Sequence, residues 1–243
     1  MISILIPIYN GIEFIDESVT SVLNQTYTDW ELLIGVNGHP KNSNVYKKAK
    51  EYEKSIKIRV FDFYNIKGKS NTLNEMLKFC NYKYIALLDV DDIWHPQKLE
   101  VQSSLFVSNY DVIGSRCIWF GDAPDIVPNI PTGDISNFDF SLVNPIINSS
   151  SIIKKEFCYW NSKWDGIEDY DLWLRLRKLG KKFFNCNEIL VRHRIHSSSA
   201  FNAKGNDNKV DNLLVIHGFK SRFEKQNERI NILQLNKIDM KLF

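Results

Sequence analysis

The sequence predicts an α/β domain built on a Rossmann-like, mostly parallel central sheet with helices on both of its faces. In the first half of the chain, short apolar runs typical of strands alternate with apolar residues at helical spacing. Turn-forming residues follow several of these runs directly, as at Asn37-Gly38. Such alternation forms βαβ units, whose strands run parallel. At 243 residues, 44% of them hydrophobic, the chain is long enough for one domain with a sizeable core.

Each element of the first half has its own pattern. Apolar, β-rich runs predict five strands, at 2–8, 30–36, 57–63, 84–88 and 111–118. Apolar residues at helical spacing from Ile12 to Leu23 predict the first helix, with Asn10 as its N-cap. Further helices are expected at 47–54 and 72–79. Another opens near Pro96, because proline is common in a first helical turn.

The second half of the chain is less regular. Residues 121–148 are loop-like and rich in Pro, Asn and Asp. A helix is expected at 168–179, with Gly180 as the residue just past its end. A strand is expected at 189–195, and the polar residues 197–208 are predicted to be mobile.

Composition excludes several classes of protein. Lysine and arginine number 31 against 29 acidic residues, so the net charge of +2 gives no argument for nucleic-acid binding. The four cysteines form no CxxC pair, which favours reduced core residues over a zinc or redox site. No signal peptide is visible, and no apolar run approaches the ~20 residues of a membrane-spanning helix. We therefore expect a cytoplasmic protein, in which the sequons at Asn24 and Asn148 are chance matches.

Three aspartates follow the strand expected at 84–88, at the edge where parallel sheets bind ligands. Asp89 and Asp91 are two apart, so on an extended chain both side chains point into one site. Two such carboxylates repel each other unless a cation lies between them. Carboxylate oxygens are suitable ligands for Mg²⁺ or Mn²⁺. Such a cation would neutralise the charge of a departing diphosphate. The alternative is that Asp91 or Asp92 only caps the helix near Pro96, with Asp92 the stronger candidate for that role.

A second acidic pair, Glu168-Asp169, begins the helix expected at 168–179. One interpretation is a general base that takes a proton from a hydroxyl. The alternative is that both acids only stabilise the positive end of the helix dipole. The residues alone favour the helix dipole.

Three further patterns are weaker. Lys67-Gly68-Lys69-Ser70 lacks the earlier glycine of a P-loop, because Phe63 stands at that position. The chain also has no GxGxxG, which argues against a dinucleotide cofactor. His193 and His196 are candidate metal ligands, although a histidine is more often a surface or packing residue.

Together these motifs resemble those of the family 2 glycosyltransferases, which have the GT-A fold. The resemblance covers about residues 1–200 and rests on the order and spacing of the motifs. The first two are Ser3-Ile4-Leu5-Ile6-Pro7-Ile8-Tyr9-Asn10, and Ser21-Val22-Leu23-Asn24-Gln25-Thr26 with Trp30-Glu31. The loop and helix from Gly68 to Asn74 come next, followed by the DxD motif, Leu87-Leu88-Asp89-Val90-Asp91-Asp92 with Trp94, Pro96 and Leu99. The last two are the Glu-Asp motif, Glu168-Asp169-Tyr170-Asp171-Leu172-Trp173, and Arg194-Ile195-His196.

The resemblance implies a donor site for a nucleoside-diphosphate sugar. Pro7, Tyr9 and Asn37 would line the pocket of the nucleotide base. Lys69, in the loop before the DxD motif, would also belong to the donor site. Asp89 would contact the ribose, or the metal through water.

The resemblance also implies the metal site and the base. Asp91 would bind Mn²⁺ or Mg²⁺ directly, and His196 would contact the metal or the diphosphate. Asp169 would be the catalytic base of an inverting transfer to a hydroxyl of a growing glycan or lipid-linked acceptor. The setting typical of such proteins is bacterial surface-polysaccharide assembly, of capsule or lipopolysaccharide.

The family resemblance also implies the division of the chain. Residues 1–205 would form the GT-A domain, with a nucleotide-sugar-binding half at 1–118 and an acceptor-binding half at 119–205. The loop before Gly133 and the segment after Ser197 would close over the donor and exclude water.

One position departs from the family pattern. Asn37 stands where the family usually has an aspartate that contacts the base. An amide both donates and accepts hydrogen bonds. The oxygen of Asn37 can therefore still accept a hydrogen bond from uracil, although this neutral bond is weaker than one to a carboxylate. The amide equally suits other bases. A UDP-sugar is the expected donor.

Two alternative functions are considered. The first is a non-catalytic binding module of the same fold, and the second, less favoured, is a sugar nucleotidyltransferase. The module would lose the acids that this chain retains, and the nucleotidyltransferase would carry a Gly-rich basic loop after the first strand.

The C-terminal tail, residues 206–243, is expected to be helical. From Phe219 to Phe243 it has six basic and three acidic residues, a net charge of +3, interleaved with apolar residues. This pattern fits peripheral contact with an anionic membrane. A helix that packs on the domain or joins two copies in a homo-oligomer is the favoured alternative.

Overall fold

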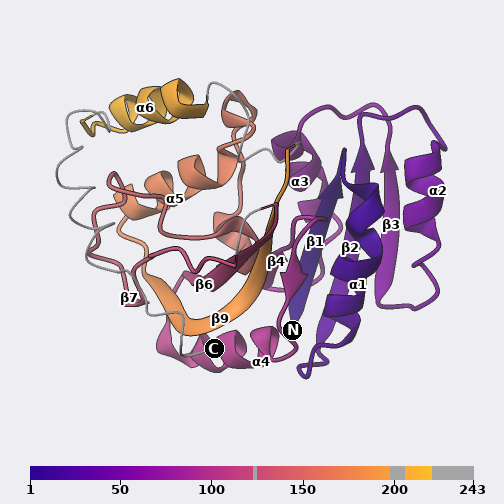
Figure 1. Cartoon of the computed structure of the whole chain (residues 1–243), viewed down its shortest axis with the longest axis horizontal. Helices are drawn as coiled ribbons and strands as arrows, with labels where there is room; N and C mark the ends of the chain where they lie inside the picture. Colours follow the sequence, from indigo (N-terminus) through magenta and orange to yellow (C-terminus); the bar gives the residue numbers. More distant parts are fainter. Residues whose placement is uncertain (123–124, 198–205, 221–243) are drawn as a thin grey trace.

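The structure is a computed structural model that describes residues 1–122, 125–197 and 206–220. In this part of the chain, nine strands form one sheet with the order β3-β2-β1-β4-β8-β6-β9-β5, and β7 pairs with β9 beside that path (Figure 1). The strands are β1 (Ile2–Ile8), β2 (Trp30–Asn37), β3 (Ile58–Phe63), β4 (Tyr84–Leu87), β5 (Ile93–Trp94), β6 (Val112–Gly121), β7 (Gly133–Asp134), β8 (Ile152–Lys154) and β9 (Phe183–Ile195).

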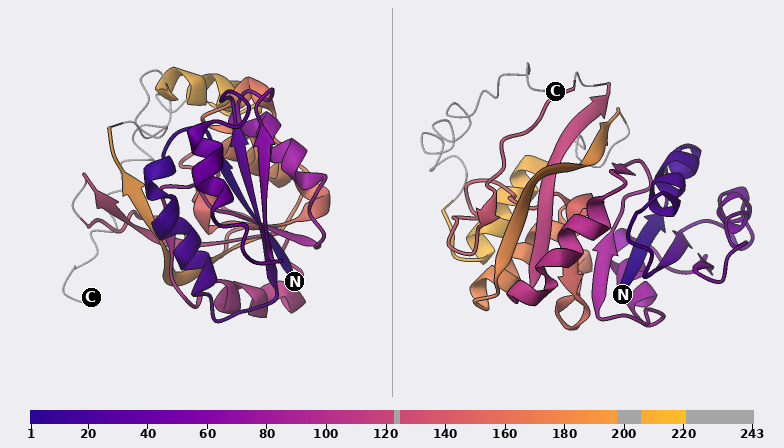
Figure 2. Two further views of the ribbon diagram at one scale, coloured as in Figure 1. Left: turned by 90° about the vertical axis from the view of Figure 1, so that its right-hand side faces the viewer. Right: turned by 90° about the horizontal axis from the view of Figure 1, so that it is seen from below.

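Helices lie on both sides of the first four strands (Figure 2). The α-helices are α1 (Ile15–Leu23), α2 (Asn44–Lys50), α3 (Lys69–Leu77), α4 (Lys98–Ser103), α5 (Glu168–Lys178) and α6 (Asn206–Ile216). Short 3-10 helices join them: η1 (Ile12–Phe14), η2 (Ser104–Ser108), η3 (Asn148–Ser150), η4 (Lys155–Phe157) and η5 (Ser162–Trp164).

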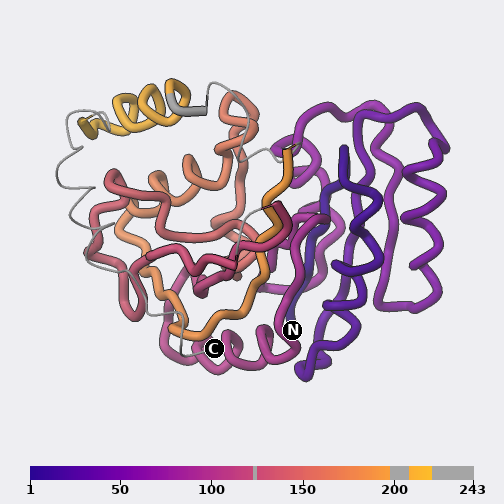
Figure 3. The backbone as a smooth tube through the Cα atoms, in the orientation of Figure 1, coloured from indigo at the N-terminus to yellow at the C-terminus, as the bar shows by residue number. Residues whose placement is uncertain are grey.

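The two halves of the sheet differ in strand direction. β2 pairs in parallel with β1 and β3, and β1 with β4, which confirms the parallel arrangement expected for the first half. Beyond β4 the sheet is mixed, because β8 is antiparallel to both β4 and β6. β9 runs parallel to β6 and antiparallel to β5. Figure 3 shows β9, in orange, curving through the lower part of the view and rising towards the end of the parallel strands.

Alternating side chains of β1 fill two cores. Leu5 packs in a cluster with residues of α3 and α5, such as Leu73 and Trp173. Ile4 and Ile6 pack in a second cluster with α1, which contributes Ile15, Val19 and Val22. All seven residues of β1 are buried, as expected for a central parallel strand covered on both faces.

Several element boundaries differ from expectation. Asn10 is not an N-cap: Gly11, with φ of 87°, precedes η1, and α1 follows without a side-chain cap. Helix α3 begins at Lys69, three residues before the expected start. Strand β9 begins at Phe183 rather than at 189, because residues 183–186 pair with residues 112–115 of β6. The polar Asn185 in this stretch is completely buried and donates to the carbonyls of Pro131 and Pro145.

Helix α6 packs on the rest of the domain through Leu213 and Leu214, which are fully buried. Just past its end, His217 Nε2 lies 3.1 Å from Asp171 Oδ1 of α5. This confirms a helix at the start of the expected tail, whereas residues 221–243, with most of the basic charge, lie outside the described residues, as does most of the segment after Ser197. Within the described ranges, no helix is both long and apolar enough to cross a membrane. All four cysteines are free.

Candidate active site

The carboxyl ends of β1, β2 and β4 meet at one edge of the sheet, and the predicted residues gather there. After β4 the chain turns instead of continuing extended, because Asp92 N donates to Asp89 O at 3.0 Å. The extended geometry expected for Asp89 and Asp91 is therefore wrong. Their carboxylates have separate partners, although they remain close enough for Asp89 to affect the pKa of Asp91.

Asp89 is held from two sides. Lys69 Nζ lies 2.6 Å from its Oδ1, and Asn148 Nδ2 donates to both carboxylate oxygens at 3.0 and 3.1 Å. Its backbone N–H donates to Ser149 Oγ at 3.0 Å. Burial opposes ionisation, but the Lys69 ammonium outweighs it and lowers the pKa of Asp89. Asp89 is thus an ionised, oriented carboxylate.

Lys69 joins the two halves of the chain. Its Nζ also lies 3.2 Å from Glu168 Oε1, at the first residue of α5. The Glu168 side chain is only 4% exposed, and its Oε2 accepts from Gly166 N at 2.6 Å. Burial lowers the pKa of Lys69, but Asp89 and Glu168 outweigh burial and raise it overall. The lysine expected in the donor site therefore connects the end of β4 to the start of α5.

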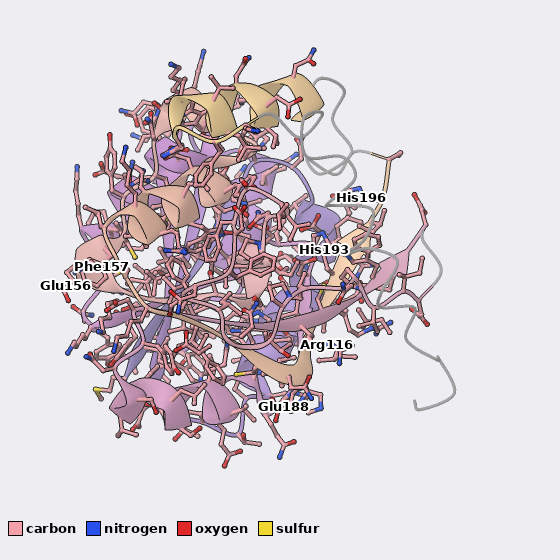
Figure 4. The ribbon with its side chains drawn as sticks, turned by 90° about the vertical axis from the view of Figure 1, so that its left-hand side faces the viewer. Arg116, Glu156, Phe157, Glu188, His193 and His196 are labelled. Atoms are coloured by element: carbon pink, nitrogen blue, oxygen red, sulfur yellow. The ribbon has the colours of Figure 1, made fainter. Side chains whose placement is uncertain are left out.

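Asp91 faces the end of β9. Its Oδ2 lies 3.0 Å from His196 Nε2. Burial, then the neighbouring Asp92 and Asp89, raise the pKa of Asp91. Figure 4 shows His196 and His193 near the end of β9. The sequence-predicted pair of metal ligands is thus brought together.

These two side chains fit part of a divalent cation site. One carboxylate oxygen and one imidazole nitrogen converge, both suitable ligands for Mn²⁺. No group of three or more His, Cys, Asp or Glu side chains that could hold a metal occurs in the described ranges. Substrate oxygens and water would have to complete the coordination, as is usual for Mg²⁺ beside phosphates.

Asp92 does not cap the helix after Pro96, contrary to the expectation. Its carboxylate is 1% exposed, accepts from Arg194 N at 2.9 Å and lies 3.0 Å from His193 Nδ1. Helix α4 has no side-chain cap. Burial opposes protonation of His193, but Asp92 raises its pKa to about 9. His193 therefore ties β9 to the DxD turn through Asp92.

Arg194 completes this connection. Its Nε donates to Asp91 O at 2.9 Å and its Nη2 lies 2.8 Å from Glu17 Oε1 of α1. The guanidinium also lies 4.4 Å from the ring centres of both Phe14 and Phe120. A planar cation can bond and stack at once, so Arg194 fixes the DxD turn against α1 and η1.

Asp169 lies in the first turn of α5, next to Glu168. Asn144 Nδ2 donates to its Oδ2 at 3.0 Å. Burial, and then the charge of Glu168, raise the pKa of Asp169 to about 6, while Lys69 and the Asn144 hydrogen bond oppose the rise. A half-buried carboxylate with this pKa is suited to accept a proton near neutral pH.

The residues expected around the base lie at the ends of β1 and β2. Pro7 is buried in β1, and Asn37, the last residue of β2, is 3% exposed. Tyr9 is 58% exposed, and its ring centre lies 5.3 Å from that of His39. The structure thus presents one exposed aromatic ring beside a buried amide at this edge.

Sequence reasoning missed Asn144, Asn148 and Ser149, which bind the site carboxylates and the DxD backbone. The signal was present as a polar run directly before β8, at Asn148-Ser149-Ser150-Ser151. Its serines are fully buried, which a polar composition does not indicate.

Comparison with known proteins identifies the class. The structure matches S. aureus TarS (residues 1–349, with UDP-GlcNAc) with a TM-score of 0.71 at 12% identity, over all of this chain and 76% of that one. It matches the mannosyltransferase PcManGT from Pyrobaculum calidifontis, in complex with GDP-Man and Mn²⁺, with a TM-score of 0.63 at 12% identity, over 93% of this chain and 64% of that one. The fold is therefore that of GT-A glycosyltransferases.

The sequence model of glycosyl transferase family 2 matches residues 3–160, and the chain belongs to this family. It is 29% identical over 210 residues to UDP-Glc:alpha-D-GlcNAc-diphosphoundecaprenol beta-1,3-glucosyltransferase WfgD of Escherichia coli, covering 82% of this chain and 79% of WfgD. It is 28% identical over 208 residues to the O-antigen biosynthesis glycosyltransferase WbnJ of Escherichia coli, covering 82% of this chain and 81% of WbnJ. It spans 37% of a 27% identical, uncharacterized glycosyltransferase of Rickettsia conorii.

Proposed function

We propose that this chain is an inverting, metal-dependent glycosyltransferase of the hexosyl or N-acetylhexosaminyl class. It would move the sugar of a nucleoside-diphosphate sugar, a UDP-sugar in our proposal, to a hydroxyl of a growing glycan or lipid-linked acceptor. The observation that carries the proposal is Lys69, whose ammonium contacts Asp89 on the donor side and Glu168 beside Asp169. A carboxylate with a pKa of about 6 thus lies next to the proposed donor site.

The chemical step assigns the proton to Asp169. The acceptor hydroxyl loses its proton to the Asp169 carboxylate while its oxygen forms a bond to the anomeric carbon. The bond from that carbon to the diphosphate breaks on the opposite side, and the nucleoside diphosphate leaves with the electron pair. Attack opposite to the leaving group inverts the anomeric centre.

The donor is held, in this proposal, at the edge formed by β1, β2 and the DxD turn. Tyr9 and Pro7 line the base pocket, Asn37 bonds the base, and Asp89 contacts the ribose. Asp91 and His196 would hold Mn²⁺ or Mg²⁺, which supplies positive charge to the departing diphosphate when bound. The UDP-GlcNAc complex of TarS and the GDP-Man and Mn²⁺ complex of PcManGT support this donor class.

The setting follows from the relatives. WfgD is named for a diphosphoundecaprenol acceptor and WbnJ for O-antigen biosynthesis. These names support a role in bacterial surface-polysaccharide assembly, with the reaction on the cytoplasmic side of the membrane. Contact of the basic tail with that membrane stays a prediction. Sedimentation with anionic liposomes should be lost on deletion of residues 221–243, and unchanged sedimentation would contradict membrane contact.

Calorimetric titration tests the function. UDP, GDP, CDP and dTDP are each titrated with and without Mn²⁺, and the diphosphate that binds directs a transfer assay with its sugar derivatives. Tight binding of UDP only with metal, followed by transfer with inversion, is the expected result. Absence of metal-dependent binding for all four diphosphates would contradict the proposed enzymatic function and favour a non-catalytic module of the same fold. Preference for another base would correct the donor and the role of Asn37.

A further inference from the structure

Residues 144–151 contact the site carboxylates and form many hydrogen bonds to neighbouring elements. Ser149, Ser150 and Ser151 are fully buried, although they are polar. Their carbonyl groups accept from Trp94 Nε1 at 2.7 Å, Gln102 Nε2 at 2.8 Å and Leu87 N at 3.2 Å, respectively. One short segment is therefore bonded to β5, α4 and the last residue of β4.

The same segment is also bonded to the second half of the sheet. Ser115 N of β6 donates to Ser150 Oγ at 3.2 Å, and Asn185 Nδ2 of β9 donates to Pro145 O at 2.8 Å. Within the segment, Ser150 Oγ donates to Ile147 O at 2.8 Å and Ser151 Oγ to Asn148 O at 2.7 Å. Since buried polar groups are costly to leave unbonded, these contacts allow little movement of the segment.

Two asparagines of this segment each hold a site carboxylate. Asn144 donates to Asp169 at 3.0 Å, and Asn148 donates to both oxygens of Asp89. The amide of Asn144 is oriented by its own backbone, because Ile146 N donates to its Oδ1 at 3.4 Å. An ionised carboxylate only accepts hydrogen bonds, so this orientation presents the correct group to Asp169.

We propose that Asn144 is a positioning residue for the base Asp169, and that residues 144–148 set the separation between the base and the donor-side Asp89. The inference rests on the proposed function. Neither asparagine transfers a proton. Asn144 acts by restricting the direction of the Asp169 carboxylate and by stabilising its ionised form.

The charges around Asp169 explain why such a bond is needed. Glu168 is its neighbour in the chain and carries a nearly buried carboxylate, while Lys69 Nζ is shared between Glu168 and Asp89. Burial and Glu168 raise the pKa of Asp169, and Lys69 and Asn144 lower it. The hydrogen bond from Asn144 therefore keeps more of the base ionised near pH 7.

The variants Asn144→Asp and Asn144→Ala test the proposal. Asn144→Asp keeps the shape of the side chain but replaces the donor by a second carboxylate. Both variants should lower kcat at pH 7 by about tenfold or more, the loss expected for one hydrogen bond to a charged group. The acidic limb of the pH–rate profile should move to higher pH, and donor affinity by calorimetry should stay within about threefold.

Two further variants separate positioning from folding. Asn161→Asp makes the same change of charge at the N-cap of η5 and keeps the oxygen that accepts from Lys163 N. It should leave kcat and the pH profile unchanged. Asn148→Ala, which acts on Asp89, should instead weaken donor binding.

The outcomes distinguish this inference from the proposed function. If Asp169→Asn is inactive but the Asn144 variants retain the wild-type pH profile, the positioning role of Asn144 is contradicted. The assignment of Asp169 as the base would still hold. A loss that lies only in donor KM would also contradict it. If Asp169→Asn is fully active, the proposed base itself is wrong.

Discussion

Asp91 Oδ2 and His196 Nε2 lie 3.0 Å apart, although 105 residues separate them in the chain. Strand β9 makes this contact by running parallel to β6 over its whole length, so that its last residues reach the DxD turn. Arg194 and His193 of the same strand bind the Asp91 carbonyl and the Asp92 carboxylate. The end of β9 and His196 therefore hold both aspartates of this turn, Asp91 and Asp92.

The variant Asp91→Asn should abolish most of the metal dependence of UDP binding. An amide retains an oxygen ligand and can still bond to His196, but it lacks the negative charge. We expect at least about a tenfold loss in the Mn²⁺-dependent part of the affinity. Calorimetry with and without Mn²⁺ measures it, with Asp16→Asn on the exposed face of α1 as the matched control. Full metal dependence in Asp91→Asn would exclude this residue as a ligand.

The variant Asp169→Asn should lower the rate of transfer by about 10²–10⁴-fold, the usual contribution of a general base. Donor affinity should change by less than about threefold, because Asp169 lies on the proposed acceptor side of Lys69. Steady-state kinetics and calorimetry measure the two quantities. Asp134→Asn in β7 is the control. Equal losses of rate and donor affinity would contradict the assignment.

The pH dependence of kcat/KM should follow the ionisation of Asp169. Its pKa is raised to about 6, so the carboxyl group is protonated below this pH and ionised above it. A base must be ionised, and activity should therefore fall as the pH drops through about 6. Glu168→Gln removes a charge that raises this pKa, so the midpoint should move to lower pH. A midpoint that stays in place would show that another group limits the rate.

The variant Lys69→Met should destabilise the fold. It leaves the Asp89 carboxylate and the nearly buried Glu168 carboxylate without their shared cation. Loss of one partner of a buried pair costs about 3–5 kcal/mol, and we expect about 2 kcal/mol because Lys69 and Asp89 are partly exposed. Urea unfolding measures the change. The double variant Lys69→Met/Glu168→Gln should recover part of the lost free energy of unfolding. No recovery would mean that the unpaired Glu168 carboxylate does not cause the loss.

The parallel half of the fold was predictable because β1, β2 and β4 are buried on both faces and appear as continuous apolar runs. The motif residues Asp89, Asp91 and Asp169 were identifiable from their order along the chain. Their partners were not, because each contact joins distant segments: Asn148 lies 59 residues from Asp89. A single sequence does not indicate which polar loop will be buried against a strand.

The same limit explains two errors. Asp92 and Asn10 are residue types that favour N-caps, and propensity alone assigned them that role. In the structure, Asp92 instead binds the backbone of β9, and Gly11 forms the start of η1 with a left-handed conformation. Long-range contacts outweighed a local preference worth about 1 kcal/mol.

The continuous sheet has a consequence for folding. The expected nucleotide-sugar-binding half (1–118) and the expected acceptor-binding half (119–205) contribute strands to one sheet, and they meet where β4 pairs with β8. No flexible linker separates them in the described chain at that point. Chemical denaturation should therefore remove both in a single cooperative transition, and neither half should persist as a partly folded intermediate.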